Sequence, residues 1–301
     1  MTTRAHVSTL AAAILGATLA VAPPVPAQEE GPANAKGTSV DKTGKGYSAA
    51  FVIDPATRKV YFEENADMVL PVASMAKMMT CLIAVERIQH GLLTLDKPVT
   101  ISARASKMGG SQIYAKEGQT FPVKILLAAA MIQSANDAAT ALAEDIAGSN
   151  EKFAEMMNAR AKQLGLAHTT FHDPHGLPNR KEPDSVDKMS ARDLATLGME
   201  LMKYPLMREY ARMATFPFEN GTFTAGLTNP NHLVNPGKRD YMPNATGIKT
   251  GYSVPAGFCI TASAQKNGRQ LIAVVMGAAA RYGPKSSFGI AARLMNEAFA
   301  K

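Results

Sequence analysis

Tryptophan is absent from the 301-residue chain, and cysteine occurs only twice, at Cys81 and Cys259. Two cysteines cannot build the disulfide framework that holds many small secreted domains together, so the fold must depend on a hydrophobic core. Both cysteines lie in apolar stretches, where a free thiol behaves as a small buried side chain. We therefore favour two free, unreactive thiols over a disulfide.

Long apolar runs are also lacking, except near the start of the chain. Residues 10–21 are rich in Ala, Leu, Ile and Val and follow a short polar segment with Arg4. The run falls short of the roughly 20 residues of a membrane-spanning helix. Val25-Pro26-Ala27 fits a cleavage pattern for secretory signals, with the cut before Gln28. The sequence thus predicts a signal peptide over residues 1–27, a flexible lead-in over 28–46 and an exported mature chain.

No dense block of basic residues occurs, although the chain has 32 Lys and Arg against 25 Asp and Glu, a net charge of +7. Binding of nucleic acid requires a clustered basic stripe, so that class of function is excluded. Metal binding is disfavoured as well. His168 and His172 have a helical spacing, but Pro174 and the turn-forming Asp173-Pro174-His175-Gly176 oppose a helix there. We predict no metal and no cofactor.

The pattern of apolar residues predicts an α+β fold in which strands lie at both ends of the chain and helices between them. Two short strands, 48–53 and 59–63, flank the turn at Asp54-Pro55, and Lys266-Asn267-Gly268-Arg269 signals a second hairpin. Further strands are expected at 247–252, 258–265 and 270–276. Helices are expected at 74–90, 123–131, 137–147, 151–164, 191–203 and 286–299. Such an arrangement predicts an antiparallel sheet flanked by helices, with a separate helical lobe and the first hairpin joined to the last strands.

Ser74-Met75-Ala76-Lys77 is the first of three short motifs that carry chemistry. On a helix the two polar residues share a face, so an amine lies beside a hydroxyl. A serine hydroxyl needs a base to become a nucleophile, and a buried lysine near a second cation can supply one. The alternative is a solvated serine and lysine at the start of a helix.

Two further motifs follow, Ser134-Ala135-Asn136 and Lys249-Thr250-Gly251. Ser134 offers a second hydroxyl to relay a proton, and the Asn136 amide both donates and accepts. Lys249 and Thr250 suit a carboxylate, and Gly251 allows a substrate backbone to approach. The alternatives are that Asn136 caps a helix beginning at Asp137 and that Lys249 is exposed at a strand edge. In sequence, the three motifs favour acyl transfer through a serine.

These residues resemble the serine D-Ala-D-Ala carboxypeptidases, the low-molecular-mass penicillin-binding proteins of the bacterial envelope. The resemblance runs from about residue 47 to 277 and includes the segments 71–80, 134–139, 171–177 and 247–252. It implies the fold shared with serine β-lactamases and a peptidase domain over residues 47–301 without an additional C-terminal domain. It also implies a place in the periplasm or on the outer face of the cytoplasmic membrane, soluble or peripherally attached.

The resemblance implies a role for each motif residue. Ser74 would be the nucleophile and Lys77 its base, and Ser134 and Asn136 would form the facing wall. Lys249 and Thr250 would bind a terminal carboxylate, and the backbone N–H groups of Ser74 and Tyr252 would form an oxyanion hole. The sequence departs from the family pattern in three segments: Ala135 replaces the usual Gly, Thr246 replaces Asp, and Pro230 and His232 occupy a segment where many relatives have Arg.

The resulting hypothesis is a DD-carboxypeptidase that removes the terminal D-Ala from peptidoglycan stem pentapeptides and is acylated by β-lactams. A DD-endopeptidase that cleaves cross-links is a close alternative. A class A β-lactamase would use a Glu roughly 35 residues beyond the Ser-x-Asn motif. This chain has no Glu between Glu155 and Glu182, which disfavours that alternative. A non-catalytic binder of stem peptides is disfavoured because Ser74 and Lys77 are both present. The oligomeric state is left open.

Overall fold

The structure is a computed structural model that describes residues 44–178, 185–220 and 226–301. The expected signal peptide and most of the expected lead-in lie outside these residues. Within the described parts of the chain, no helix is long and apolar enough to cross a membrane.

The central element is a five-stranded antiparallel sheet in the order β2-β1-β11-β10-β9. Its strands are β1 (Ala49–Ile53), β2 (Val60–Glu64), β9 (Ala245–Ser253), β10 (Gly257–Lys266) and β11 (Arg269–Ala278). The predicted N-terminal hairpin joins the C-terminal strands, since Ala49 to Ile53 pair with Met276 to Ile272. Both expected hairpins and the antiparallel sheet are confirmed, with strand ends shifted by one or two residues.

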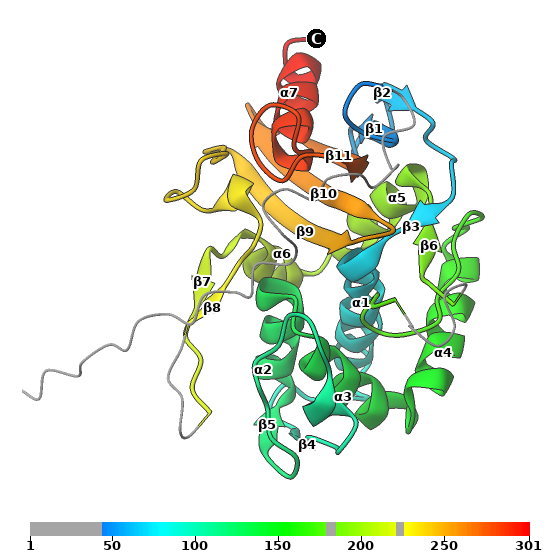
Figure 1. The fold of residues 1–301 in the computed structure, drawn as a ribbon, viewed down its shortest axis with the longest axis vertical. Helices are drawn as coiled ribbons and strands as arrows, with labels where there is room; N and C mark the ends of the chain where they lie inside the picture. The colour runs from blue at the N-terminus through cyan, green and yellow to red at the C-terminus, as the bar shows by residue number, and fades with distance from the viewer. Residues whose placement is uncertain (1–43, 179–184, 221–225) are drawn as a thin grey trace, which may run out of the picture.

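Helices cover both faces of the sheet (Figure 1). Helix α7 (Ser287–Phe299) packs on β10 and β11 from one side. On the other side lie α5 (Ala191–Leu201), which packs on β1 and β11, and α6 (Pro205–Arg212), which packs on β9. Two clusters of buried apolar side chains therefore sandwich the sheet, which makes its middle strands almost wholly buried.

The helical lobe lies below the sheet in Figure 1 and is built around α1 (Lys77–Gln89). Against α1 pack α3 (Asn136–Ala147), α4 (Asn150–Gln163) and α5, and α2 (Val123–Ala128) continues into a π-helical turn, η3 (Ala129–Gln133). A 3-10 turn, η1 (Ala73–Ala76), leads into α1 and contacts β9. The lobe and the sheet therefore meet where η1 lies against β9.

Short elements complete the fold. They are the strand pairs β3 (Leu70–Pro71) with β6 (Lys188–Met189), β4 (Pro98–Thr100) with β5 (Thr120–Pro122), and β7 (Thr215–Phe216) with β8 (Leu227–Thr228), and the 3-10 turns η2 (Ala105–Lys107) and η4 (His232–Val234).

One expectation about a helix end is wrong. Asn136 is not an N-cap, because Ala135 holds that position and Asn136 is already helical. The helix expected over 191–203 ends at Leu201, and Pro205 occupies the first turn of α6, where its missing N–H costs nothing. Ser149 and Ser190 cap α4 and α5 by accepting from Lys152 N and Asp193 N.

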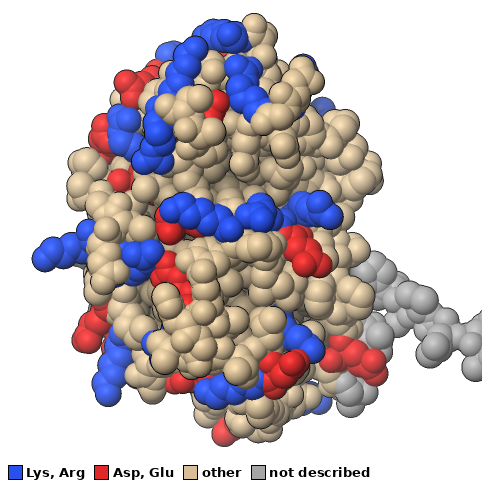
Figure 2. All heavy atoms as spheres, turned by 180° about the vertical axis from the view of Figure 1, so that it is seen from behind, with Lys and Arg blue, Asp and Glu red and all other residues tan. Residues whose placement is uncertain are grey.

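The surface carries its positive charge in separate groups. On the face shown in Figure 2, Lys and Arg side chains gather at the top and in a short row across the middle, with acidic side chains near both groups. Many of the described cations are paired, as in the contacts of Arg192 with Asp67 and of Lys97 with Asp145.

Candidate active site

Ser74 lies in the 3-10 turn that precedes α1, and the amine of Lys77 lies beside it. Lys77 Nζ donates to Ser74 Oγ at 3.0 Å, and the lysine is completely buried while Ser74 is 4% exposed. Ala73, just before the serine, has a φ of 47° in the left-handed region, which is strained for a residue with a Cβ. These features overturn the alternative of a solvated pair at a helix start.

Ser134 lies at the break between η3 and α3. The chain turns there through a left-handed residue, since Ser134 has a φ of 64°. Lys249 Nζ donates to Ser134 Oγ at 2.8 Å and to its neighbour's carbonyl, Thr250 O, at 3.1 Å. Lys249 is only 2% exposed, so the alternative of an exposed lysine on a strand edge is wrong. A second hydroxyl–amine pair thus parallels the first.

Asn136 forms part of the wall of the site through its side chain. Its Nδ2 donates to Gly109 O at 2.7 Å, and its buried Oδ1 has no hydrogen-bond partner among the described residues. Gly110 leaves room for this amide, because a Cβ there would lie 2.8 Å from Nδ2 and 3.3 Å from Leu177 Cδ2. The Gly109-Gly110 segment therefore lies next to both the Asn136 amide and the side chain of Leu177.

Gly251 lets the strand β9 approach the nucleophile turn. A Cβ on Gly251 would lie 2.7 Å from Val72 O and 3.2 Å from Ser74 N, so its missing side chain admits the protein's own backbone. The approach of a substrate backbone to Gly251 stays a prediction. Thr250 is half-buried on the same strand, and the ring of Tyr252 stacks on Phe258 at 4.4 Å between centroids. The oxyanion hole expected from Ser74 and Tyr252 N–H groups stays a prediction.

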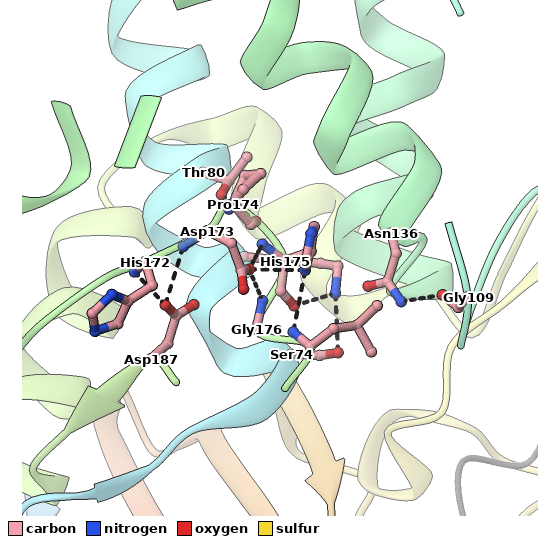
Figure 3. Close-up of polar contacts among 12 residues, drawn as sticks. Ser74, Thr80, Gly109, Asn136, His172, Asp173, Pro174, His175, Gly176 and Asp187 are labelled. Atoms are coloured by element: carbon pink, nitrogen blue, oxygen red, sulfur yellow. Dashed lines mark hydrogen bonds and ion pairs between the residues drawn. The ribbon is translucent and has the colours of Figure 1, made fainter. Parts of the chain in front are cut away.

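The turn at His172 to Gly176, labelled in Figure 3, supplies backbone carbonyls to Lys77 and Thr80. Lys77 Nζ donates to His175 O at 2.8 Å, and Thr80 Oγ1 donates to Pro174 O at 2.6 Å. Gly176 presses on the backbone before the serine, since a Cβ there would lie 1.9 Å from Ala73 O. The segment weighed for a metal instead supplies backbone carbonyls to α1.

Two ionisable side chains, Asp173 and His175, stabilise this turn. Asp173 Oδ1 accepts from His175 N and Gly176 N, and lies 2.8 Å from His175 Nδ1. Leu177 N donates to the same Nδ1 at 3.1 Å. Burial acts to raise the pKa of Asp173, but the charge and hydrogen bonds of His175 outweigh it and hold that pKa below its usual value.

Other buried polar groups lie close to the motifs. Asp137 accepts from Ile113 N and Ala115 N and so anchors the loop that contains Gly110 to α3, and burial raises its pKa. Burial also raises the pKa of the Cys81 and Cys259 thiols to about 12, and both thiols are free, as favoured from the sequence. In the described parts of the chain, no cluster of three or more His, Cys, Asp or Glu suits a metal ion.

Two of the residues that depart from the family pattern, Thr246 and His232, make specific local contacts. Thr246 Oγ1 lies 2.6 Å from Ser263 Oγ across β9 and β10. His232 stacks between Tyr282 and Phe288 and lies 3.3 Å from Asp240, and burial lowers its pKa. Its ring is thus held in an aromatic stack.

The arrangement as a whole can carry out nucleophilic chemistry. Two hydroxyls each face a buried ammonium or amine, and an amide with one unpaired oxygen lies beside them. Such a set can activate a nucleophile, transfer a proton to a leaving group and hold a carboxylate.

A family comparison decides the class of protein. The D-alanyl-D-alanine carboxypeptidase family of S11 peptidases matches residues 38–280. The chain belongs to this family. Among relatives, it is 36% identical to DacF of Bacillus subtilis over 84% of this chain and 62% of DacF. It is 32% identical to a D-alanyl-D-alanine endopeptidase of Pseudomonas aeruginosa over 78% of this chain and 72% of that protein. The chain therefore spans less than two thirds of the DacF length.

Solved structures of S11-like proteins have the same fold. DacD of Francisella tularensis matches with a TM-score of 0.75 at 26% identity, covering 85% of this chain and 70% of that one. Penicillin-binding protein D2 of Listeria monocytogenes was solved in an ampicillin-bound form. It matches with a TM-score of 0.73 at 27% identity, and the match covers 84% of this chain and 98% of that one. These matches confirm the expected α+β fold of penicillin-binding proteins.

Several groups in the site were not predicted from the sequence. Gly109 and Asp187 carried no motif signal, Thr80 was noted only within the family resemblance, and the turn at 172–176 was weighed for a metal but not for a contact with Lys77. Two of these contacts run through backbone carbonyls, which residue types do not encode. The Asp-Pro-His-Gly turn was the one signal in the sequence that could have predicted these contacts. A turn with a buried acid exposes its backbone carbonyls on its outer side, where they can accept hydrogen bonds.

Proposed function

We propose that this S11-family protein is a serine DD-carboxypeptidase that removes the terminal D-Ala from peptidoglycan stem pentapeptides. The observation that carries the proposal is the paired buried contacts of Lys77 with Ser74 and of Lys249 with Ser134. Ser74 attacks the peptide carbonyl while Lys77 takes its proton. An acyl-enzyme forms, the bond to the last D-Ala breaks, and water then releases the shortened stem.

The remaining motif residues take their roles from their positions. Ser134 passes a proton to the departing amine, because its hydroxyl is polarised by the Lys249 ammonium. Lys249 and Thr250 bind the terminal carboxylate, and the unpaired Asn136 Oδ1 accepts from a substrate amide. Gly251 keeps β9 against the nucleophile turn, so that the N–H groups of Ser74 and Tyr252 stabilise the oxyanion.

The substrate determines where the protein acts. Peptidoglycan lies outside the cytoplasm, so we propose export by the signal expected over residues 1–27, with residues 47–301 forming the peptidase domain. β-Lactams resemble the acyl-D-Ala-D-Ala end and would acylate Ser74. The ampicillin-bound form of the Listeria protein supports this inhibitor class.

The test is D-alanine release from a muropeptide pentapeptide, beside the variant Ser74→Ala. We expect release by the parent protein and a loss of about 10⁶-fold in the variant, as is typical when a serine hydrolase loses its nucleophile. A mass increase equal to one penicillin, in the parent only, is the second expected result. Full activity of Ser74→Ala would sink the proposal.

A DD-endopeptidase is the second candidate, because the chain is also 32% identical to the Pseudomonas D-alanyl-D-alanine endopeptidase. Cross-linked muropeptide dimers separate the two activities. Conversion of dimers to monomers without release of D-alanine from pentapeptides would favour the endopeptidase.

A further inference from the structure

A buried acid outside the three motifs, Asp187, connects the two segments that hold the nucleophile and its base. Asp187 Oδ1 accepts from His172 N at 2.6 Å and from Asp173 N at 3.3 Å, at the start of the turn that faces Lys77. Its backbone carbonyl accepts from Val72 N at 3.1 Å, two residues before Ser74. One residue thus bonds to both the turn and the chain entering η1.

The turn transmits its position to Lys77 directly. His172 and Asp173 begin the turn whose next two carbonyls, of Pro174 and His175, accept from Thr80 and Lys77. Figure 3 shows this succession from Asp187 through the turn to Ser74. A shift of the Asp187 carboxyl therefore moves the acceptor that orients the Lys77 amine.

The surroundings of Asp187 favour its neutral form. The residue is 3% exposed, and its Oδ2 is buried with no hydrogen-bond partner among the described residues. The charged groups that face it are Asp173 and Lys77, with His175 beyond Asp173. Burial, together with the Asp173 charge, raises the pKa of Asp187 well above its usual value.

We propose that Asp187 is a positioning residue for Lys77 and Ser74, and that it performs this role in its neutral form. The proposal rests on the proposed function, in which Lys77 accepts the proton of Ser74. A neutral carboxyl still accepts from His172 and Asp173 through its carbonyl oxygen. An ionised one would add a negative charge near Lys77, which stabilises the ammonium and so disfavours the amine that a base requires.

The experiment compares Asp187→Asn and Asp187→Ala with the parent in the rate of acylation by a fluorescent penicillin from pH 6 to pH 10. Asn keeps the acceptor oxygen and removes the titration, whereas Ala removes both. We expect Asp187→Asn to acylate within a few-fold of the parent at neutral pH. We expect the ratio of its rate to that of the parent to rise with pH, because only the parent gains the charge.

Asp187→Ala should lose about 100-fold in acylation rate at every pH, the effect of misplacing a reacting group by about 1 Å. A matched control is Asp54→Asn. Asp54 is equally buried and accepts from Ala56 N and Thr57 N, but it lies in the turn between β1 and β2. The ratio of the Asp54→Asn acylation rate to that of the parent should stay constant with pH. The midpoints of thermal unfolding, measured for all variants, report whether folding is retained.

Three results would overturn the proposal: a ratio for Asp187→Asn that is constant with pH, an Asn variant as slow as the Ala variant, or an Ala variant as fast as the parent. A readout independent of turnover is ¹³C NMR of aspartate carboxyls, in which the signal lost in Asp187→Asn should titrate above the usual range. An ordinary pKa for that signal contradicts the proposal even if the parent has no peptidase activity. A parent that is neither acylated nor active contradicts the proposed function instead.

Discussion

The ammonium of Lys249 lies 2.8 Å from the hydroxyl of Ser134, although 115 residues separate them in the chain. The contact joins the edge strand of the sheet to the helical lobe, and it mirrors the contact between Lys77 and Ser74 within the lobe. The site therefore exists only where the two parts of the fold meet.

Removing the Ser134 hydroxyl should impair catalysis without harming the fold. Ser134→Gly and Ser134→Ala both delete the proposed proton relay, and we expect each to slow acylation by about 10²- to 10⁴-fold. Because Ser134 has a φ of 64°, the Gly variant should be more stable than the Ala variant by about 1 kcal/mol. Stopped-flow acylation and urea denaturation measure the two effects, and equal stability of both variants would contradict the backbone argument.

Adding a methyl group at Gly110 should weaken substrate binding. A Cβ there would lie 2.8 Å from Asn136 Nδ2 and displace the amide that we propose holds the substrate. Gly110→Ala should raise the KM for a pentapeptide by about tenfold, equivalent to one hydrogen bond of about 1.4 kcal/mol. The neighbouring Gly109→Ala is the control, because no atom lies within 4 Å of its added Cβ. Similar KM values for both variants would argue against the role of Asn136.

Gly176→Ala should misplace the nucleophile. The new Cβ would lie 1.9 Å from Ala73 O, so the backbone before Ser74 must move. We expect acylation to fall by at least about 100-fold. Gly165→Ala is matched in φ, at 71° against 80°, but its Cβ meets no atom within 4 Å. It should lose only about 1–2 kcal/mol of stability and keep its acylation rate.

The stability of the parent should depend on pH through Asp137. Burial raises its pKa above 3.8, so the folded chain keeps a proton that the unfolded chain has released. The free energy of unfolding should therefore fall as the pH rises from 3.8 through the folded pKa, and level off above it. Asp137→Asn lacks this titration. Denaturation from pH 3.5 to 7 should show the parent losing stability relative to the variant, and parallel curves would refute the assignment.

The sheet, its hairpins and most helices were predictable because they depend on local pattern. The apolar run in 270–276 and the Asn267-Gly268 turn describe a hairpin regardless of what surrounds it. The three motifs were predictable for another reason, since their residue types are chemically unusual together. Their mutual contacts were not, because the distance between Ser134 and Lys249 depends on how η1, α3 and β9 pack.

Gly251 and Asn136 illustrate where residue types mislead. A glycine in a strand indicates a close approach, but the sequence does not say whether a substrate or the chain itself approaches. Asn before Asp137 fits an N-cap, yet the left-handed turn at Ser134 places the helix start one residue earlier. Likewise, Pro205 ends one helical pattern and begins the next, which only the packing of α6 on β9 decides.

The order of the strands has a consequence for when this protein can first react with a substrate. Strand β1 has β2 and β11 as neighbours, and β9 reaches β1 only through β10 and β11. The sheet thus stays open in its middle until residues 269–278 have been made and inserted. A growing chain can form η1 and α1, with Ser74 and Lys77, before that moment, but until the sheet is complete nothing brings Lys249 to Ser134. Under the function that we propose, acylation should therefore begin only after residues 269–278 have joined the sheet.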